Sequence, residues 1–328
     1  MITLQEMFVP PLNFLQECTE NDAFYQSIQK ANLDGFQFGY FIIYRNNKII
    51  TVAPYFVMDF NLNTLLPEGI LKRCTNWIKF NLACIGNPIA DFGRIHGEIS
   101  VEILNLINQS LAKKGSLLAY KGFVDELPLA DFTQVNSLPV PVLQLGPNYF
   151  SELPSERRNL LKRKLKKAVS LRYEEHQGLP LQWLEKVYAL YLQTYQKAEL
   201  KFEKLNPQYF LETGIISHYL LFFEEEKLIG FTQLIGRNHY LVNRYIGLDY
   251  SRSHEYGLYF VMFIKTIEFA IDKGFTQLEL GATSYEFKRR LGAKIIPTWN
   301  YFQHVNPILN WGLKKFKNLL EPSASELK

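Results

Sequence analysis

The chain has 328 residues, of which 47% are hydrophobic and 21% are charged. These values exclude a disordered chain, and the length favours two domains of about 150 residues each over a single core. The net charge is only +4, yet seven positive charges lie within eleven residues, namely Arg157, Arg158, Lys162, Arg163, Lys164, Lys166 and Lys167. The basic character is therefore local.

The amino-terminal residues and the cysteines indicate a cytoplasmic protein. The start of the chain lacks a basic run and is interrupted by Pro10 and Pro11, so it does not resemble a signal peptide. The longest uncharged apolar run, 258–264, is far shorter than the roughly 18 residues that a membrane-spanning helix needs. Neither the three cysteines nor the six histidines show the spacing of a zinc site. We expect no bound metal.

The first half of the chain alternates between strand and helix patterns. Aromatic and β-branched runs flank Asn46-Asn47, a pair that favours a tight hairpin turn. Apolar residues then recur at helical spacing before Gly115, which predicts a helix and its stop. In order, the expected elements are a helix at 22–32, strands at 38–44 and 49–57, a helix at 69–79, a strand at 82–85, a helix at 99–111 and a strand at 116–120.

The second half repeats this plan after the extended, proline-bounded segment 137–147, which we take as the boundary between halves. Its expected elements are helices at 149–170 and 182–197 and strands at 217–223, 228–236 and 240–248. The tyrosines of the helix at 182–197 are expected to lie in the core and at its rim. This weak duplication predicts two related α/β domains in tandem, of the α+β type, over 1–146 and 147–306, followed by a helix and tail at 307–328.

The segment 240–292 is where we expect a ligand. It reads as a strand, a short polar loop over 249–257, a buried helix, a second strand and a Gly-Ala turn. A strand, a crossover helix and a second strand normally make a parallel pair, and ligands bind at the carboxyl ends of such strands. Backbone N–H groups at the start of the helix favour anions, so a phosphate-bearing cofactor is expected there.

Three passages of the second half carry a family resemblance. They are Tyr149-Phe150 through Arg157-Arg158-Asn159-Leu160; Tyr256-Gly257-Leu258 with the helix end at Ala270–Phe275; and Leu280-Gly281-Ala282 followed by Glu286–Gly292, Pro297, Thr298 and His304. In these passages the chain resembles the tandem-domain GNAT acyltransferases, in particular the FemAB-like and CelD-like branch related to the Fem-type peptidoglycan aminoacyltransferases. The resemblance implies two GNAT-like domains, each a mixed, mostly antiparallel sheet flanked by helices.

The resemblance also implies an acyl donor, normally acyl-coenzyme A, whose pyrophosphate meets the backbone at the start of the helix after the fourth strand. The residues placed there are Leu248, Asp249, Arg252, Ser253, Tyr256 and Gly257, with Lys288 as a further partner for phosphate or carboxylate groups. The usual loop of the family carries two glycines in an Arg/Gln-x-x-Gly-x-Gly/Ala pattern, whereas 251–257 contains one. Fem-type enzymes use aminoacyl-tRNA instead, so this donor is the alternative.

The implied chemistry is attack by an amine on an acyl ester or thioester, which needs a base, an acid and a donor for the oxyanion. Candidate bases are Glu255, His254 and Glu286, and candidate acids are Tyr245 and Tyr285. Two of these have structural alternatives: Glu255 could simply favour a helix start, and Glu286 could pair with Arg289 or Arg290.

Three functional hypotheses follow. The first is an N-acyltransferase that moves an acyl group from acyl-coenzyme A to an amine on a small molecule, envelope precursor or lipid, by direct attack. The second is an aminoacyl-tRNA-dependent transferase, which the basic helix over 157–167 favours, although that helix could equally be a solvated face. The third is a GNAT-like binding or scaffold protein without catalysis. The last helix, 306–320, is typical either of peripheral contact with the inner face of a membrane or of packing on the domain.

Overall fold

The computed structural model describes residues 1–11, 14, 19–61, 79–198, 203–324 and 326–327, and this part of the chain forms two compact units. The first unit comprises Met1–Gln16, Asp34–Val140 and Ile296–Lys328, and the second comprises Glu17–Leu33 and Pro141–Ile295. The units therefore differ from the continuous ranges expected from sequence, because an early helix joins the second unit and a late strand joins the first. The helix expected at 69–79 lies outside the described residues, except that Lys79 begins a strand.

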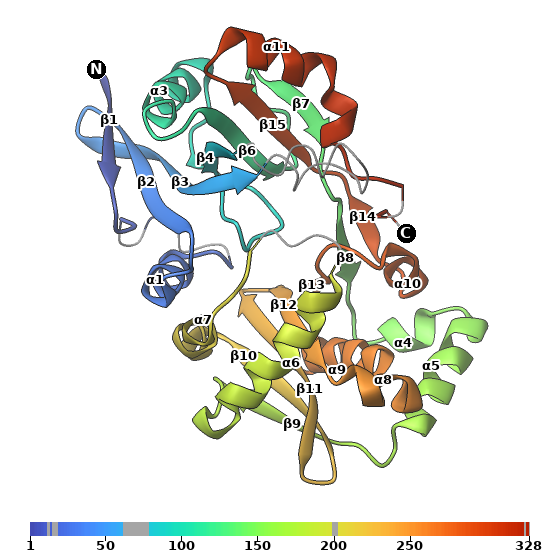
Figure 1. Cartoon of the computed structure of the whole chain (residues 1–328). Helices are drawn as coiled ribbons and strands as arrows, with labels where there is room; N and C mark the ends of the chain where they lie inside the picture. Colours follow the sequence, from blue (N-terminus) through green and yellow to red (C-terminus); the bar gives the residue numbers. More distant parts are fainter. Residues whose placement is uncertain (12–13, 15–18, 62–78, 199–202, 325, 328) are drawn as a thin grey trace. The chain divides into compact units, whose positions relative to one another are not determined.

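The sheet of the first unit has the order β1-β2-β3-β4-β6-β15-β7, with β5 paired to β3 (Figure 1). The neighbouring strands are antiparallel except for β4 and β6, which are parallel. The strands are β1 (Ile2–Met7), β2 (Phe36–Arg45), β3 (Lys48–Asn61), β4 (Lys79–Ile85), β5 (His96–Gly97), β6 (Leu117–Phe123), β7 (Thr133–Asn136) and β15 (Trp299–His304).

Local signals explain most of these elements. Asn46 and Asn47 have φ angles of 52° and 61°, the left-handed conformation that a two-residue hairpin turn requires, so the predicted hairpin of β2 and β3 is confirmed. Helix α3 (Val101–Leu111) begins where the Ser100 hydroxyl accepts a hydrogen bond from the Ile103 N–H. It buries Ile103, Leu104, Ile107 and Leu111 and leads from β4 to β6, whereas Ile99, expected to begin the helix, precedes it and is exposed. Helix α11 (Pro307–Lys315) and a 3-10 turn (Lys317–Leu320) follow β15.

The sheet of the second unit has the order β14-β8-β13-β12-β11-β10-β9 (Figure 1). Its strands are β8 (Val140–Gln144), β9 (Arg172–Gln177), β10 (His218–Glu224), β11 (Lys227–Arg237), β12 (Tyr240–Leu248), β13 (Gln277–Glu279) and β14 (Lys294–Ile296). β12 and β13 are parallel, as predicted, whereas β9 to β12 run antiparallel. Each unit is thus a mixed, mostly antiparallel sheet flanked by helices.

The helices of the second unit are α1 (Asp22–Ala31), α4 (Tyr149–Glu152), α5 (Ser155–Lys167), α6 (Leu184–Lys197), α7 (Pro207–Glu212), α8 (Tyr250–Tyr256), α9 (Leu258–Asp272) and α10 (Tyr285–Arg290). Two expectations need correction. The helix expected over 149–170 is two helices, because Pro154 cannot continue the helical hydrogen bonding. The loop expected over 249–257 is mostly helical, because Asp249 caps α8.

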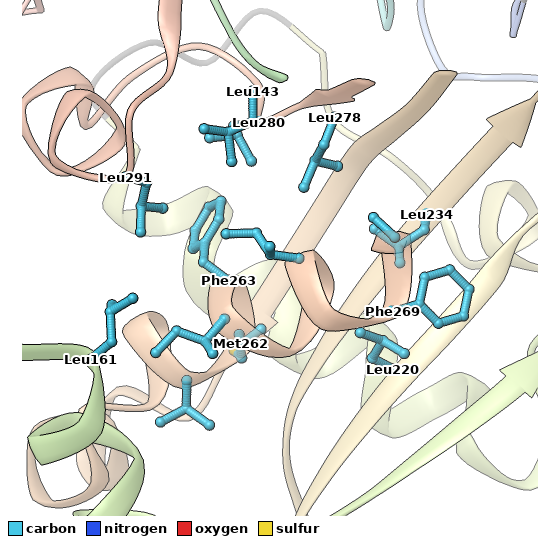
Figure 2. Packing of buried hydrophobic residues seen from close by; sticks show 14 of the residues in the cluster. Leu143, Leu161, Leu220, Leu234, Met262, Phe263, Phe269, Leu278, Leu280 and Leu291 are labelled. Carbon is cyan, nitrogen blue, oxygen red and sulfur yellow. The ribbon is translucent and has the colours of Figure 1, made fainter. Parts of the chain in front are cut away.

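The sheet of the second unit is covered on both faces. Successive residues of β11 show this: a Cβ added to Gly230 would lie 3.2 Å from the sulfur of Met262 in α9, whereas Phe231 packs on Phe210 of α7 at 5.9 Å between ring centroids. Neighbouring side chains of a strand point to opposite faces, so α9 covers one face and α6 with α7 the other. Figure 2 shows the apolar core on the α9 face, where Met262, Phe263 and Phe269 pack against strand leucines.

Candidate functional site

The parallel strands β12 and β13 separate partway along β12. They pair from Tyr240 and Gln277 to Val242 and Glu279, after which β12 continues to Leu248 while the chain beyond Glu279 turns into α10. Because the carboxyl ends of parallel strands are where ligands bind in such sheets, the far half of β12 is the centre of the candidate site.

A β-bulge interrupts β12 at this point. Gln233 pairs with Tyr245 and the next residue of β11 pairs with Asn243, so Arg244 is an extra residue in the ladder. Tyr245 directly follows the bulge and faces α6 and α7, as Gly247 does two residues later. The Tyr245 ring packs on Tyr209 of α7 at 5.6 Å, and burial raises the pKa of Tyr209 while the nearby charge of Arg244 lowers it.

Tyr245, a predicted acid, is paired with a carboxylate that the sequence did not reveal. Its hydroxyl donates a hydrogen bond of 2.8 Å to Oε1 of Glu203. Burial and the Glu203 charge both raise the pKa of Tyr245 well above the usual 10.0, so the phenol keeps its proton at neutral pH. Burial raises the pKa values of Tyr191 and Tyr195 of α6, and the charge of the nearby Glu203 carboxylate raises them further. Glu203 lies in a short segment without periodicity, so no sequence signal identified it.

Arg244 belongs to a buried cluster of three charges. Its guanidinium donates to Oε1 of Glu20 at 2.6 Å, with both side chains almost completely buried. Burial opposes the charge of Arg244, but Glu20 and Glu279 outweigh this effect and raise its pKa. Tyr240 donates to the Glu279 carboxylate at 2.7 Å. Glu20 is 224 residues away from Arg244 in the sequence, so no local sequence signal predicts this cluster.

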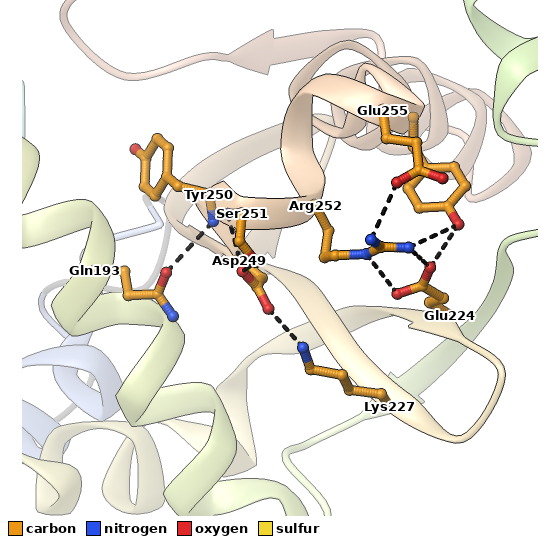
Figure 3. A network of polar contacts seen from close by, with 9 residues as sticks. Gln193, Glu224, Lys227, Asp249, Tyr250, Ser251, Arg252 and Glu255 are labelled. Carbon is orange, nitrogen blue, oxygen red and sulfur yellow. Dashed lines mark hydrogen bonds and ion pairs between the residues drawn. The ribbon is translucent and has the colours of Figure 1, made fainter.

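The expected phosphate loop is organised by its own side chains (Figure 3). The Asp249 carboxylate accepts from the N–H and hydroxyl of Ser251 and pairs with Lys227 at 2.8 Å. Burial opposes the charge of Asp249, but Lys227 and Ser251 outweigh it and lower the pKa. The carboxylate of Asp249 therefore already occupies the start of α8, where a phosphate was expected. Leu248, another predicted cofactor residue, is buried in the core on the α9 face.

Arg252, also predicted to bind the cofactor, faces carboxylates instead (Figure 3), and Tyr256 contacts one of them. The Arg252 guanidinium is hydrogen-bonded to Glu224 and paired with Glu255 at 3.1 Å. Tyr256 donates to Glu224 at 2.6 Å, and these two hydrogen bonds lower the pKa of Glu224. The positive charge of Arg252 is balanced by these two carboxylates, so the group has no excess positive charge for a phosphate. Its contacts stabilise α8 instead. His254, a predicted base, is exposed on the same helix, and Ser253 accepts the Gly257 N–H through its carbonyl.

The ammonium group of a lysine in α5 lies near the start of α9. Gly257, with φ of 59°, separates α8 from α9, and among the described residues no side chain caps α9. The ammonium of Lys164 from α5 lies 4.3 Å from the centre of the Phe260 ring, and a Cβ added to Gly257 would be 3.9 Å from it. A helix start beside an ammonium group favours a bound anion. The sequence identified Lys164 only as one member of the basic run.

The turn after β13 lies beside the same end of α9. Gly281, Thr283 and Ser284 all have positive φ, of 74°, 74° and 51°, and such strain in a branched residue marks candidate functional positions. Tyr259 of α9 is hydrogen-bonded to Ser284, and burial raises its pKa. Phe287 of α10 packs on Phe260 at 4.7 Å between ring centroids. The two halves of the predicted site are therefore neighbours.

Three predicted site residues lie on α10, each with a structural partner. Lys288 is buried and its ammonium donates to the carbonyls of Gly281 and Ala282 at 2.8 and 3.0 Å, which fixes the strained turn. Tyr285 is fully buried, with Arg289 near its ring. Glu286 is exposed and pairs with Arg290, the alternative that the sequence left open. Within the described residues, no group of three or more His, Cys, Asp or Glu side chains could hold a metal ion.

Comparisons with known proteins bear on the fold. No family model matches the sequence, and no curated protein does either. Solved structures are similar: FemX, with a TM-score of 0.54 at 10% identity over 88% of this chain and 93% of that one; and a tandem GNAT protein from the clavulanic acid biosynthesis pathway, without AcCoA, with 0.53 at 11% identity over 94% and 99%. The chain has the tandem GNAT fold.

A third structure agrees with this tandem GNAT assignment. L-PGS from Bacillus licheniformis has a TM-score of 0.52 at 9% identity over 80% of this chain and 85% of that one. The expected fold class is therefore confirmed. Likeness at such identities concerns the fold alone.

Proposed function

We propose that the second unit is an N-acyltransferase that transfers an acyl group from acyl-coenzyme A to an amine by direct attack. The observation that carries this proposal is the separation of β12 and β13. On one face of β12, beside the bulge, lies the Tyr245–Glu203 pair, and on the other face α9 begins beside Lys164. In the proposal the donor binds on the α9 face and the acceptor on the α6 face.

The donor side needs positive charge and helix-start dipoles for a pyrophosphate. Lys164 supplies an ammonium group beside Gly257, and the first turn of α9 supplies backbone N–H groups. Arg252 instead stabilises α8 through Glu224, so its contribution to donor binding is indirect. This arrangement uses a lysine from α5 in place of the second loop glycine of the family pattern.

The acceptor side needs a base for the amine and an acid for the leaving group. Glu203 accepts the proton that the amine loses as the C–N bond forms. Tyr245 donates its proton to the thiolate as the C–S bond breaks, and Glu203 then returns the first proton to Tyr245 along their hydrogen bond. One proton leaves the amine and one reaches the thiol, so the step balances.

An aminoacyl-tRNA donor is the second candidate, and helix α5 favours it. Four basic side chains next to Lys164 along this helix are exposed, namely Lys162, Arg163, Lys166 and Lys167. Such a row suits a nucleic-acid backbone, whose binding weakens steeply with salt. The chemistry at Tyr245 would be unchanged, except that the leaving group would be a ribose hydroxyl.

Thermal unfolding in the presence of acetyl- and long-chain acyl-coenzyme A tests the proposal. A ligand at about 100 times its Kd stabilises the folded state by roughly 2.7 kcal/mol, which shifts the melting temperature measurably. We expect Lys164→Ala to weaken donor binding about ten-fold, while Lys162→Ala, an exposed lysine on the same helix, serves as the control.

The other outcomes separate the alternatives. If no coenzyme A species stabilises the protein and tRNA is retained in a salt-dependent way, aminoacyl-tRNA replaces acyl-coenzyme A as the proposed donor. Absence of both responses would remove the transferase and favour a binding protein with this fold.

A further inference from the structure

An exposed apolar surface lies at the end of the first unit. We call it the α11 surface, and its members are Val305, Ile308, Leu309, Trp311, Phe316 and Leu319. Ile308 is 77% exposed and Trp311 is 60% exposed, values that are high for large apolar side chains. Scattered exposed apolar residues are normal, but six within fifteen consecutive positions mark an interaction site.

Polar contacts fix how α11 is oriented on the unit. The side chain of Asn310 accepts from the His304 N–H at 3.1 Å, and Asn306 caps the helix by accepting from the Ile308 N–H at 2.9 Å. The Asn306 N–H in turn donates to the His304 ring at 2.9 Å. Because Asn310 faces β15, the residues three, four and seven apart on the opposite side, Ile308, Trp311 and Lys315, point to solvent. The exposure of Ile308 and Trp311 thus follows from how α11 is anchored.

The charge of this segment has one sign. Residues 305–320 include Lys314, Lys315 and Lys317 and contain no Asp or Glu. The ammonium of Lys315 lies 4.8 Å from the Trp311 ring centre and 5.9 Å from that of Phe316. Lys315 therefore borders two of the apolar side chains directly, and no carboxylate within the segment neutralises the three lysines.

We propose that the α11 surface binds the headgroup region of an anionic lipid bilayer. Exposed aromatic and aliphatic side chains with bordering lysines are the features of a helix that lies in the interface, and each lysine adds attraction to anionic lipids. A second copy of the chain is a poorer occupant, because a two-fold contact through this surface would bring the same lysines together. Within the described residues, no helix is long and apolar enough to cross a membrane.

Co-sedimentation of the full chain with vesicles tests this proposal. We expect binding to vesicles of mixed phosphatidylcholine and phosphatidylglycerol and much weaker binding to phosphatidylcholine alone. Ile308→Ser with Trp311→Ser should lower binding by at least about ten-fold, since two buried apolar side chains are lost. Replacing Lys314, Lys315 and Lys317 by Gln should lower binding roughly five-fold per lysine, on the anionic vesicles only.

Ile215→Ser is the matched control, because Ile215 is equally exposed but lies in the second unit. It should leave vesicle binding unchanged, and all variants should have the same melting temperature as the wild type. Failure to bind either vesicle, or binding that survives the Ile308 and Trp311 substitutions, overturns the proposal. So does a wild-type dimer that the same substitutions dissociate, because the α11 surface would then be a contact between copies. None of these outcomes depends on acyl transfer.

Discussion

The hydroxyl of Tyr245 donates a 2.8 Å hydrogen bond to the Glu203 carboxylate. Tyr245 lies directly after the bulge at Arg244, and its ring packs on Tyr209 of α7. A phenol that stays protonated next to a carboxylate is the combination of acid and base that transfer to an amine requires. The proposed chemistry therefore depends on this pair.

Substitutions in this pair should separate catalysis from donor binding. Glu203→Gln keeps the shape but removes the base, and we expect turnover with a panel of primary amines to fall about 10²- to 10³-fold. Tyr245→Phe should lower turnover about ten-fold or more, with the affinity for acyl-coenzyme A unchanged in both variants. Thiol release from acetyl-coenzyme A measures the rates. Glu286→Gln is the control, because Glu286 is exposed and paired with Arg290, and unaltered turnover in Glu203→Gln would exclude Glu203 as the base.

The pH dependence of turnover follows from the raised pKa of Tyr245. Burial and Glu203 both favour the neutral phenol, so its pKa lies above 10.0, and the acid remains protonated throughout the neutral and mildly alkaline range. We expect no alkaline decline in kcat below about pH 10 that depends on Tyr245. A decline near pH 8 or 9 in the wild type that disappears in Tyr245→Phe would mean that the phenol titrates normally and is not held as described.

The buried pair of Glu20 and Arg244 should stabilise the second unit and attach the early segment to it. Glu20→Gln leaves a buried guanidinium with fewer counter-charges, which costs roughly 3 kcal/mol of unfolding free energy. Denaturant unfolding measures this loss. The matched control is Glu98→Ala, which removes the exposed partner of Arg45 and should cost less than about 1 kcal/mol. Equal effects of the two substitutions would show that Glu20 is not buried against Arg244.

Gly247 should be required for the approach of α6 to β12. A Cβ at this position would lie 2.7 Å from backbone atoms of Leu190 and Tyr191 and 2.3 Å from the Phe231 ring, so the helix would have to move. We expect Gly247→Ala to lower the melting temperature by an amount equivalent to about 2–3 kcal/mol. Gly146→Ala, where an added Cβ meets no described atom within 4 Å, should be nearly neutral. A neutral Gly247→Ala would contradict the close packing of α6.

Elements encoded by neighbouring residues could be predicted from the sequence. The Asn46-Asn47 turn and the parallel pair around α9 follow from short-range turn chemistry and from the chirality of crossover connections. The loop that proved to be α8 was missed because its cap, Asp249, was considered only as part of an anion site.

Features that depend on distant segments could not be predicted. Glu20 meets Arg244 across more than two hundred residues, and β15 inserts between β6 and β7, although its sequence directly follows the second unit. The basic run was recognised, but only the packing of α5 brings Lys164 to the start of α9. No local periodicity encodes these contacts, because they depend on how complete elements pack.

Mass-spectrometric analysis of products tests the proposed transfer most directly. The protein, acetyl-coenzyme A and a panel of primary amines are incubated, and both the N-acetylated amine and free coenzyme A are quantified. Direct attack predicts one thiol released per amide formed, an unmodified protein mass throughout, and loss of both products in Glu203→Gln. Absence of any amide, or an acylated protein that accumulates in place of the amide, would contradict the account.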